Sequence, residues 1–277
     1  AWRQRRAAQL PALWTGAAPE GKVVAVAQAR GGVGATTFAV NLADALQDKR
    51  GLLRKRAGAK VAVVDLDLQF GSVAALTDVE ESDAVWQMVV DGIVPDDAFV
   101  EQAMSVSDNG LSVFAAPARY CPLTALSPEQ VGAILASLRR SHDYVVVDLP
   151  RALVEWIAPV LAGADRLYLA TDVSVSSVRA ARKLIDFYMA EHPALDIHVL
   201  AAREKKPLVQ AAHHKAAAEL LERPLRHWVP ADARAAREAL DRGRPLSEIA
   251  PRSAATRAIR GIARSMRADL PPRAQLA

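Results

Sequence analysis

The chain has 277 residues, of which 51% are hydrophobic and 24% are charged, and its formal net charge is +4. This composition is typical of a globular protein and is long enough for one large α/β domain. No apolar run is long enough to span a bilayer, and no segment resembles a secretory signal. The single cysteine, Cys121, excludes a disulfide framework and fits a reducing cytoplasm, where we expect the protein to act. The mild positive charge permits anionic partners without predicting one.

The chain divides into a short arm, one domain and a tail. Residues 1–20 carry proline and glycine and are interpreted as a linker or N-terminal arm. Residues 21–270 are expected to form the domain, and residues 271–277 a tail. Within the domain, the β-branched run at 22–27 predicts a strand and the run at 38–46 predicts a helix.

A glycine-rich loop joins this strand to this helix. Such a loop and the following helix N-terminus aim backbone N–H groups at one point, which suits a polyanion such as a triphosphate. In the common pattern G-x-x-x-x-G-K-[ST], the lysine contacts the β- and γ-phosphates and the hydroxyl residue binds Mg²⁺. Here Ala35 stands at the lysine position, whereas Thr36 keeps the hydroxyl. The residues expected to bind the ligand in this loop are Arg30, Gly31, Gly32, Val33, Gly34, Ala35, Thr36 and Thr37.

Further strand-like segments alternate with helix-like segments along the chain. They are near-continuous apolar runs, as expected of parallel strands that are buried on both faces. A capping box at Ser127, Pro128 and Gln130 marks one helix start between them. The sequence therefore predicts a doubly wound α/β fold, with a mostly parallel central sheet and helices on both faces. The predicted strands are at 61–65, 111–115, 144–148, 166–170 and 197–200.

Three aspartates stand at the predicted carboxyl ends of strands. Asp65 and Asp67 follow the second strand, and Asp148 follows a later one. Ligands of such sheets bind at this edge, and Mg²⁺ prefers oxygen ligands while keeping several waters. We therefore expect the three carboxylates to lie near the glycine loop. Capping or surface aspartates are the alternative interpretation, which the glycine loop makes less favoured.

The loop at 30–37 resembles the deviant Walker A sequence, R/K-G-G-x-G-x-T-T, of the MinD/ParA ATPases. Its sequence GGVGATT, followed by FAVNLA and VVDLDLQFGSVA, is similar to that of the TadZ/CpaE branch, which is associated with Flp (Tad) pilus assembly and polar localisation. The resemblance covers roughly residues 21–268. It implies the P-loop NTPase fold, ATP and Mg²⁺ as cofactors, and an ATP-promoted homodimer. Members of this branch often carry a preceding receiver-like domain, which we expect to be absent from this chain.

The resemblance also implies roles for individual residues. Arg30 occupies the place of the family's cross-subunit lysine, and a permanently charged planar guanidinium suits phosphate. Asp67 would orient the attacking water, so Arg30 and Asp67 are the expected catalytic residues. Thr36, Asp65 and Asp148 would hold Mg²⁺ or its water shell.

Two departures from the family pattern concern the nucleotide itself. Ala35 removes a phosphate contact, so slow hydrolysis is expected. Ala202 stands where the family commonly has an asparagine that reads the adenine edge, which implies weakened or shifted base recognition. The segment 228–232 still resembles the loop that lines the base pocket, with Pro230 and Asp232 as expected contacts.

Three other features allow a structural and a functional interpretation. The basic run at 49–60 could contact DNA or acidic lipid, but a solvated loop is favoured. A C-terminal helix could lay its apolar face on a membrane, although a closing helix packed on the sheet needs the same face and is favoured. His213 and His214 cannot point the same way on a helix, so they are interpreted as surface residues rather than metal ligands. The apolar residues on that C-terminal face are Ile259, Ile262, Ala263, Met266 and Leu270.

The sequence leaves three functional classes open. The leading one is a nucleotide-dependent localisation factor, possessing weak ATPase activity, that recruits pilus or secretion assembly proteins, at a cell pole or the inner face of the membrane. The second is a nucleotide-independent scaffold with a decayed site, and the third is a ParA-like DNA-partition ATPase. The set Thr36, Asp65, Asp67 and Asp148 favours the first over the second, because a decayed site has no need of it. The sequences GGVGATT and DLDLQFG favour the first class over the third, so nucleic acid is not an expected partner.

Overall fold

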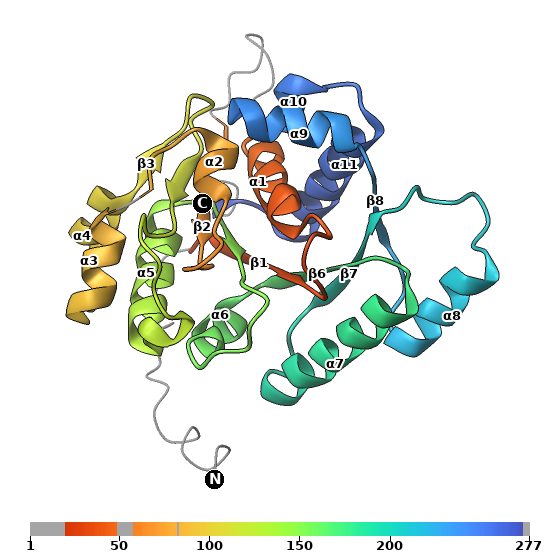
Figure 1. Ribbon diagram of the computed structural model, residues 1–277, viewed down its shortest axis with the longest axis horizontal. Coiled ribbons are helices and arrows are strands. Elements are labelled where there is room, and N and C mark those ends of the chain that lie inside the picture. The colour runs from red at the N-terminus through yellow and green to blue at the C-terminus, as the bar shows by residue number, and fades with distance from the viewer. Residues whose placement is uncertain (1–19, 49–57, 82, 274–277) are drawn as a thin grey trace.

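The computed structural model describes residues 20–48, 58–81 and 83–273, which form an eight-stranded sheet flanked by helices (Figure 1). The strand order is β3-β4-β2-β5-β1-β6-β7-β8, so β1 lies between β5 and β6. Every pair is parallel except β3 with β4. The strands are β1 (Lys22–Gln28), β2 (Val61–Asp65), β3 (Ser105–Val106), β4 (Ser112–Phe114), β5 (Tyr144–Asp148), β6 (Arg166–Thr171), β7 (Ile197–Arg203) and β8 (His227–Pro230).

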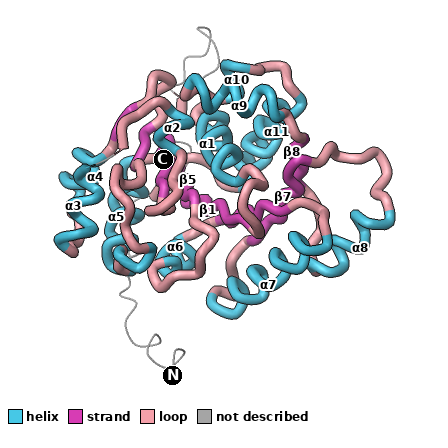
Figure 2. Tube along the Cα trace, viewed as in Figure 1, coloured by secondary structure: helices cyan, strands magenta, loops and turns pink. Residues whose placement is uncertain are grey.

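Helices cover both faces of the sheet (Figure 2). A short 3-10 helix, Leu123–Ala125, precedes α5. The α-helices are α1 (Ala35–Leu46), α2 (Val73–Thr77), α3 (Asp83–Asp91), α4 (Asp97–Ala103), α5 (Pro128–Ser141), α6 (Ile157–Gly163), α7 (Val175–Glu191), α8 (Ala212–Leu221), α9 (Ala233–Arg242), α10 (Leu246–Ile249) and α11 (Ala254–Asp269).

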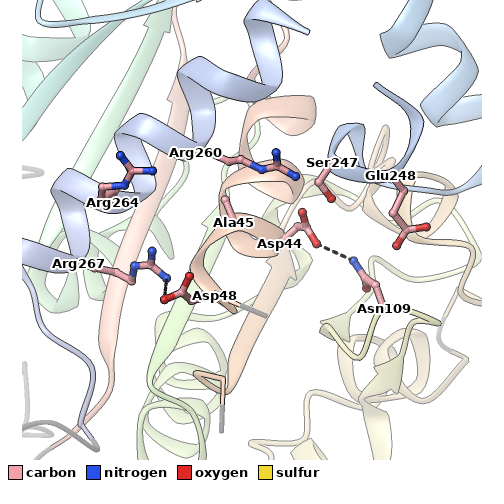
Figure 3. Close-up of a pocket in the computed structure, with 9 residues that line it drawn as sticks. All are labelled: Asp44, Ala45, Asp48, Asn109, Ser247, Glu248, Arg260, Arg264 and Arg267. Carbon is pink, nitrogen blue, oxygen red and sulfur yellow. Dashed lines mark hydrogen bonds and ion pairs between the residues drawn. The ribbon is translucent and has the colours of Figure 1, made fainter. Parts of the chain in front are cut away.

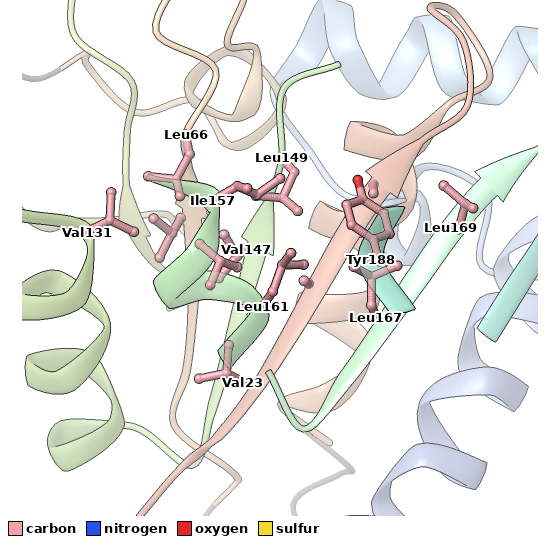
Figure 4. Close-up of a cluster of buried hydrophobic side chains, with 14 of the residues drawn as sticks. Val23, Leu66, Val131, Val147, Leu149, Ile157, Leu161, Leu167, Leu169 and Tyr188 are labelled. Carbon is pink, nitrogen blue, oxygen red and sulfur yellow. The ribbon is translucent and has the colours of Figure 1, made fainter. Parts of the chain in front are cut away.

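Each face of the sheet has its own hydrophobic core. In β1, Val23 and Ala25 pack in the core that α3 to α8 cover, part of which Figure 4 shows. Val24 and Val26 face the other way, into the core formed with α1, α2, α9, α10 and α11. Burial on both faces explains why the strands are continuous apolar runs. The predicted doubly wound α/β fold is thus confirmed.

Several predicted strand boundaries were wrong. The strand expected at 111–115 spans only Ser112–Phe114, and the one expected at 197–200 continues to Arg203. Strands β3 and β8 were not predicted, because these two edge strands are too short to give an apolar run. The segment 228–232, expected as a loop, therefore begins within a strand. Proline is tolerated at its end because an edge strand need not donate every N–H group.

The capping box at the start of α5 is confirmed. The Gln130 N–H donates to Ser127 Oγ at 3.1 Å, and the Ser127 N–H donates to Gln130 Oε1 at 2.8 Å. The Gln130 side-chain amide also donates to the carbonyls of Met88 and Ile93, at 3.1 and 2.9 Å. One residue thus caps α5 and ties it to α3.

The C-terminal helix closes the core. Ile259, Ile262, Ala263 and Met266 of α11 are buried, and the helix packs against α1 and β8. The closing-helix interpretation is therefore confirmed, and this apolar face is not available to a membrane. Within the described ranges, no helix is long and apolar enough to cross a bilayer.

The two adjacent histidines differ in environment, which corrects the expectation for one of them. His213 is exposed, as expected, but His214 is buried in the first turn of α8. Its ring contacts Trp228 edge to face, at 5.1 Å between centroids, and its Nδ1 accepts the Ala211 N–H at 3.3 Å. His214 is therefore a packing residue. The local signal was the helical spacing to Ala217 and Leu221, which are also buried.

Some expectations lie outside the described residues. These are the arm at 1–19, most of the basic run at 49–57 and the last part of the tail at 274–277.

A pair of histidines links β7 to β8. His198 Nδ1 and His227 Nε2 are 2.8 Å apart, and His198 Nε2 lies 3.1 Å from Asp196 Oδ1. Such a pair shares one proton in its neutral form. Burial lowers the pKa of His227 to about 4, and neighbouring positive charges act in the same direction. The neutral form of both imidazoles is therefore favoured at this edge of the sheet.

This pair predicts acid sensitivity. Below about pH 6.5 the unfolded chain binds a proton at His227, whereas the folded protein binds it only near pH 4, so stability falls as the pH is lowered through this window. Between about pH 7 and pH 5, the parent chain should lose roughly 1–2 kcal/mol more unfolding free energy than His227→Gln. Urea denaturation at both pH values measures this, with the exposed His213→Gln as the matched control. Equal losses in the parent chain and His227→Gln would contradict the interpretation.

Candidate functional site

The glycine loop lies where β1 ends and α1 begins. Gly32 and Gly34 have φ angles of 74° and 90°, in the left-handed region that favours glycine. Gly34 is the N-cap of α1, and no side chain caps this helix or places an acidic group in its first turn. The first backbone N–H groups of α1 are thus left for an anionic ligand, as the sequence predicted.

Two buried aspartates stand side by side at this edge of the sheet. Asp65 of β2 and Asp148 of β5 are register partners. Burial raises the pKa of Asp65 to about 6. Burial and the neighbouring Asp65 raise the pKa of Asp148, while a hydrogen bond from the Thr36 side chain opposes this shift. The expected convergence of Asp65, Asp148 and the loop is therefore present.

The buried carboxylate of Asp148 has one unused oxygen. Its Oδ1 has no hydrogen-bond partner among the described residues. The same part of the chain contains no group of three His, Cys, Asp or Glu side chains that could hold a metal by itself. A cation held partly by waters and partly by ligand phosphates fits this arrangement, and Mg²⁺ binds in this way. Thr36 and Asp148 are the residues here that could hold it, and their role as its ligands stays a prediction.

Asp65 shapes the loop that follows β2. Its Oδ1 accepts the Asp67 N–H at 3.0 Å, and its Oδ2 accepts the Val73 N–H at 3.1 Å. Both oxygens are engaged in the protein, so a place in the metal's water shell stays a prediction for this residue.

Asp67 lies half-buried in a tight turn. Its Oδ1 accepts the N–H groups of Gln69 and Phe70, at 3.2 and 3.1 Å. The turn ends at Gly71, where an added Cβ would lie 2.6 Å from both Ala116 Cβ and Asp65 Oδ2. Only glycine fits there without a shift of its neighbours. Gly71 was not among the predicted site residues, and the contact with Ala116, which is distant in sequence, leaves no local pattern.

Arg30 is ion-paired within its own chain. Its Nε donates to Asp172 Oδ2 at 2.7 Å, and its Nη2 contacts the same oxygen. Although partial burial opposes the change, hydrogen bonds from Ser174 and Arg30 lower the pKa of Asp172. Arg30 keeps 43% of its side chain exposed. Its guanidinium is therefore not free in solvent, and no local sequence pattern predicts its partner after β6.

A cavity of about 320 Å³ opens beside the glycine loop. Gly32, Gly34 and Thr37 line one side, and its walls are mainly apolar. Asp232 also lines the cavity. Its Oδ1 accepts the Ala235 N–H at 3.1 Å and thereby caps α9. An apolar cavity beside an anion-binding loop suits a ligand with one anionic and one flat apolar end. The opposite wall includes Pro230 and Asp232, the two contacts that the sequence predicts. It also includes Ala202, which stands where the family commonly has an asparagine.

A second cavity lies at the C-terminal half of α1. It measures about 580 Å³ and lies between α1, α10 and α11 (Figure 3). Its arginines stand opposite carboxylates, and Arg267 Nη1 is 3.1 Å from Asp48 Oδ2. None of the residues that the sequence predicts for ligand binding lines it. The smaller cavity is therefore the candidate site.

Comparison with known proteins agrees with this geometry. A family model described as an AAA domain matches residues 21–192. The septum site-determining protein MinD of Bacillus subtilis (strain 168) is 28% identical over 168 residues, covering 60% of this chain and 58% of that protein. The chain thus spans less than two thirds of that relative's length.

Solved structures share the fold. A ParA family ATPase from Chlorobium tepidum TLS has a TM-score of 0.73 at 22% identity, covering 87% of this chain and 98% of that one. The septum site-determining protein MinD from Pyrococcus horikoshii OT3, complexed with Mg-ADP, has a TM-score of 0.69 at 19% identity, covering 89% and 96%. The family match alone extends over more than half of the 277 residues. The chain therefore belongs to this AAA-domain family and shares its fold with the MinD and ParA ATPases.

Proposed function

We propose that the protein is a nucleotide-dependent localisation factor that binds ATP with Mg²⁺ and hydrolyses it slowly. The observation that carries this proposal is that the N-terminus of α1 adjoins both parts of the site. Gly34 and Thr37 line the apolar cavity, and Thr36 between them bonds the buried Asp148. The triphosphate of one nucleotide thus fits at the helix N-terminus, and its base fits in the adjoining apolar cavity.

The chain's own residues have distinct roles in this proposal. The N–H groups of the glycine loop hold the phosphates, while Thr36 and Asp148 hold Mg²⁺, which supplies charge neutralisation when bound. Asp67 orients the attacking water and Asp65 holds the loop that carries Asp67. The base lies in the apolar cavity, where Ala202 offers no amide to read its edge. Weak base selection follows.

Ala35 supports slow turnover. Its side chain is buried in the core behind α1 and brings no charge to the loop. Phosphate contacts are then left to backbone N–H groups, Mg²⁺ and Arg30. Positive charge at the transferring phosphate supplies much of the rate in phosphoryl transfer.

The proposed active form is a homodimer that faces its partner across the nucleotide. Arg30 then reaches the partner's phosphates, for which it must leave Asp172. The guanidinium cannot serve both anions in full, so Asp172 competes with the nucleotide for Arg30. Partial exposure of Arg30 makes this exchange accessible.

The cellular role rests on the sequence. The GGVGATT and DLDLQFG segments support a place in Flp (Tad) pilus assembly, with the dimer recruiting pilus or secretion assembly proteins in the cytoplasm at a cell pole. A scaffold with a decayed site is the second candidate, favoured by Ala35 and Ala202. A ParA-like partition role is the third, and DNA binding that depends on ATP would favour it.

ATP binding should require Mg²⁺ and depend on Asp148. Calorimetry of the parent chain should show binding that weakens when Mg²⁺ is chelated, because the metal links the phosphates to Thr36 and Asp148. Asp148→Asn should weaken Mg²⁺-dependent ATP binding roughly tenfold, because the asparagine side chain offers no negative charge to the metal. Asp241→Asn, on the exposed side of α9, is the control. No binding by the parent chain at high ATP and Mg²⁺ would favour the scaffold.

Restoring the loop lysine should raise turnover or tighten ATP binding. We expect Ala35→Lys to do so on the order of tenfold, because a hydrogen bond to a charged group contributes about 1.5–3 kcal/mol. The lysine stem must leave the buried position of Ala35, so Ala35→Met serves as the uncharged control of similar length. Steady-state ATPase assays measure the effect. Fast turnover by the parent chain would show that the missing lysine matters little.

Dimerisation should respond in opposite directions to changes of Arg30 and Asp172. Arg30→Ala should weaken ATP-promoted dimers, whereas Asp172→Asn should strengthen them by releasing Arg30. Light scattering with ATP and Mg²⁺ measures both, with the exposed Arg237→Ala as the control. If Arg30→Ala and the parent chain dimerise equally, the role across the interface is wrong. If Asp172→Asn weakens the dimer, Asp172 orients Arg30 instead of competing for it.

A further inference from the structure

The loop between β7 and α8 presents two aliphatic side chains to solvent. It spans residues 204–211 and projects at the right-hand edge of the molecule in Figure 1. Leu208 is fully exposed and Val209 is 82% exposed, the highest fractions among the large hydrophobic residues of the described chain. Aliphatic side chains this exposed bury nothing within the domain. Their position needs a reason outside it.

Basic side chains surround this tip. Lys205 and Lys206 precede it and are exposed, and His213 and Lys215 follow on the first turns of α8. The nearest acidic residue on the strand side, Glu204, is half-buried. The tip is therefore an aliphatic pair next to a cluster of positive charge.

Both ends of the loop are fixed to the folded domain. At one end Arg203 has a φ of 64°, and the Glu204 N–H donates to the Val229 carbonyl at 3.2 Å. At the other end the Ala211 N–H bonds the buried His214. The tip is thus held away from the core by its anchors, which makes its exposure a property of the fold.

We infer that this tip is a peripheral anchor for an anionic phospholipid bilayer. Leu208 and Val209 enter the boundary between headgroups and acyl chains, while Lys205 and Lys206 contact the acidic headgroups. A bilayer needs no shape complementarity, so two aliphatic side chains suffice for weak binding. A specific protein interface buries about 800 Å² per partner, which a two-residue tip does not offer. The apolar face of α11 is buried, so this helix does not compete with the loop for the bilayer.

Vesicle flotation tests the anchor. The full chain is mixed with vesicles of phosphatidylcholine, with or without phosphatidylserine, at low salt and without nucleotide. The parent chain should bind the vesicles that contain phosphatidylserine, and Leu208→Asp with Val209→Asp should weaken this at least about tenfold. Leu240→Asp, at a 45% exposed leucine of α9, is the matched control and should bind as the parent does.

Two further arms separate insertion from charge attraction. Lys205→Gln with Lys206→Gln should weaken binding on the order of tenfold and reduce its salt dependence. An environment-sensitive fluorophore on Gln210→Cys, with the buried Cys121→Ala, should brighten on the parent tip with the acidic vesicles. If the parent chain does not bind the vesicles that contain phosphatidylserine, the inference is wrong and contact with a protein partner becomes the explanation for the exposed tip. Equal binding by the double aspartate variant, or an unchanged fluorophore, overturns insertion.

Discussion

The parallel pairing of β5 between β1 and β2 is the constraint on which the site depends. It brings three carboxyl ends to one edge, so the glycine loop, Asp65 and Asp148 meet although they are far apart in sequence. Because the sheet is covered on both faces, the two carboxylates are buried. Their mutual repulsion is offset by backbone N–H groups at Asp65 and by Thr36 at Asp148. The surrounding loops take the shapes that these bonds require.

The sequence predicted what local pattern encodes. Buried strands are apolar runs, and a glycine loop or a capping box needs particular residues at fixed spacing, so the doubly wound fold, the loop at 30–37 and the start of α5 were predictable. The partner of Arg30 was not, because Asp172 meets it only after β6 pairs with β1. Gly71 was missed because its need for glycine depends partly on Ala116, which is distant in sequence, whereas the burial of His214 could have been predicted from its helical spacing to Ala217 and Leu221. Edge strands β3 and β8 were too short to leave a pattern.

The distribution of charge sets this chain apart from the common loop pattern. A lysine inside the loop would act on its own subunit's phosphates at all times. Here the loop itself is neutral at Ala35, and the nearby fixed cation is Arg30, already paired with a carboxylate. In the proposed function, electrostatic control thus moves from position 35 to Arg30, whose guanidinium exchanges Asp172 for phosphate. Such an arrangement favours a response to assembly over continuous turnover.

The cavity beside the loop has walls from opposite ends of the chain. Residues 32–38 form one side and residues 200–259 the other. The Leu246 N–H donates to Asn41 Oδ1 at 2.6 Å, which ties α10 to α1 across the same region. β8 and the helices α9, α10 and α11 therefore form a cover that belongs to the same folded unit as α1. A molecule that contacts α9 or α11 would therefore touch the elements that wall the cavity without touching the glycine loop.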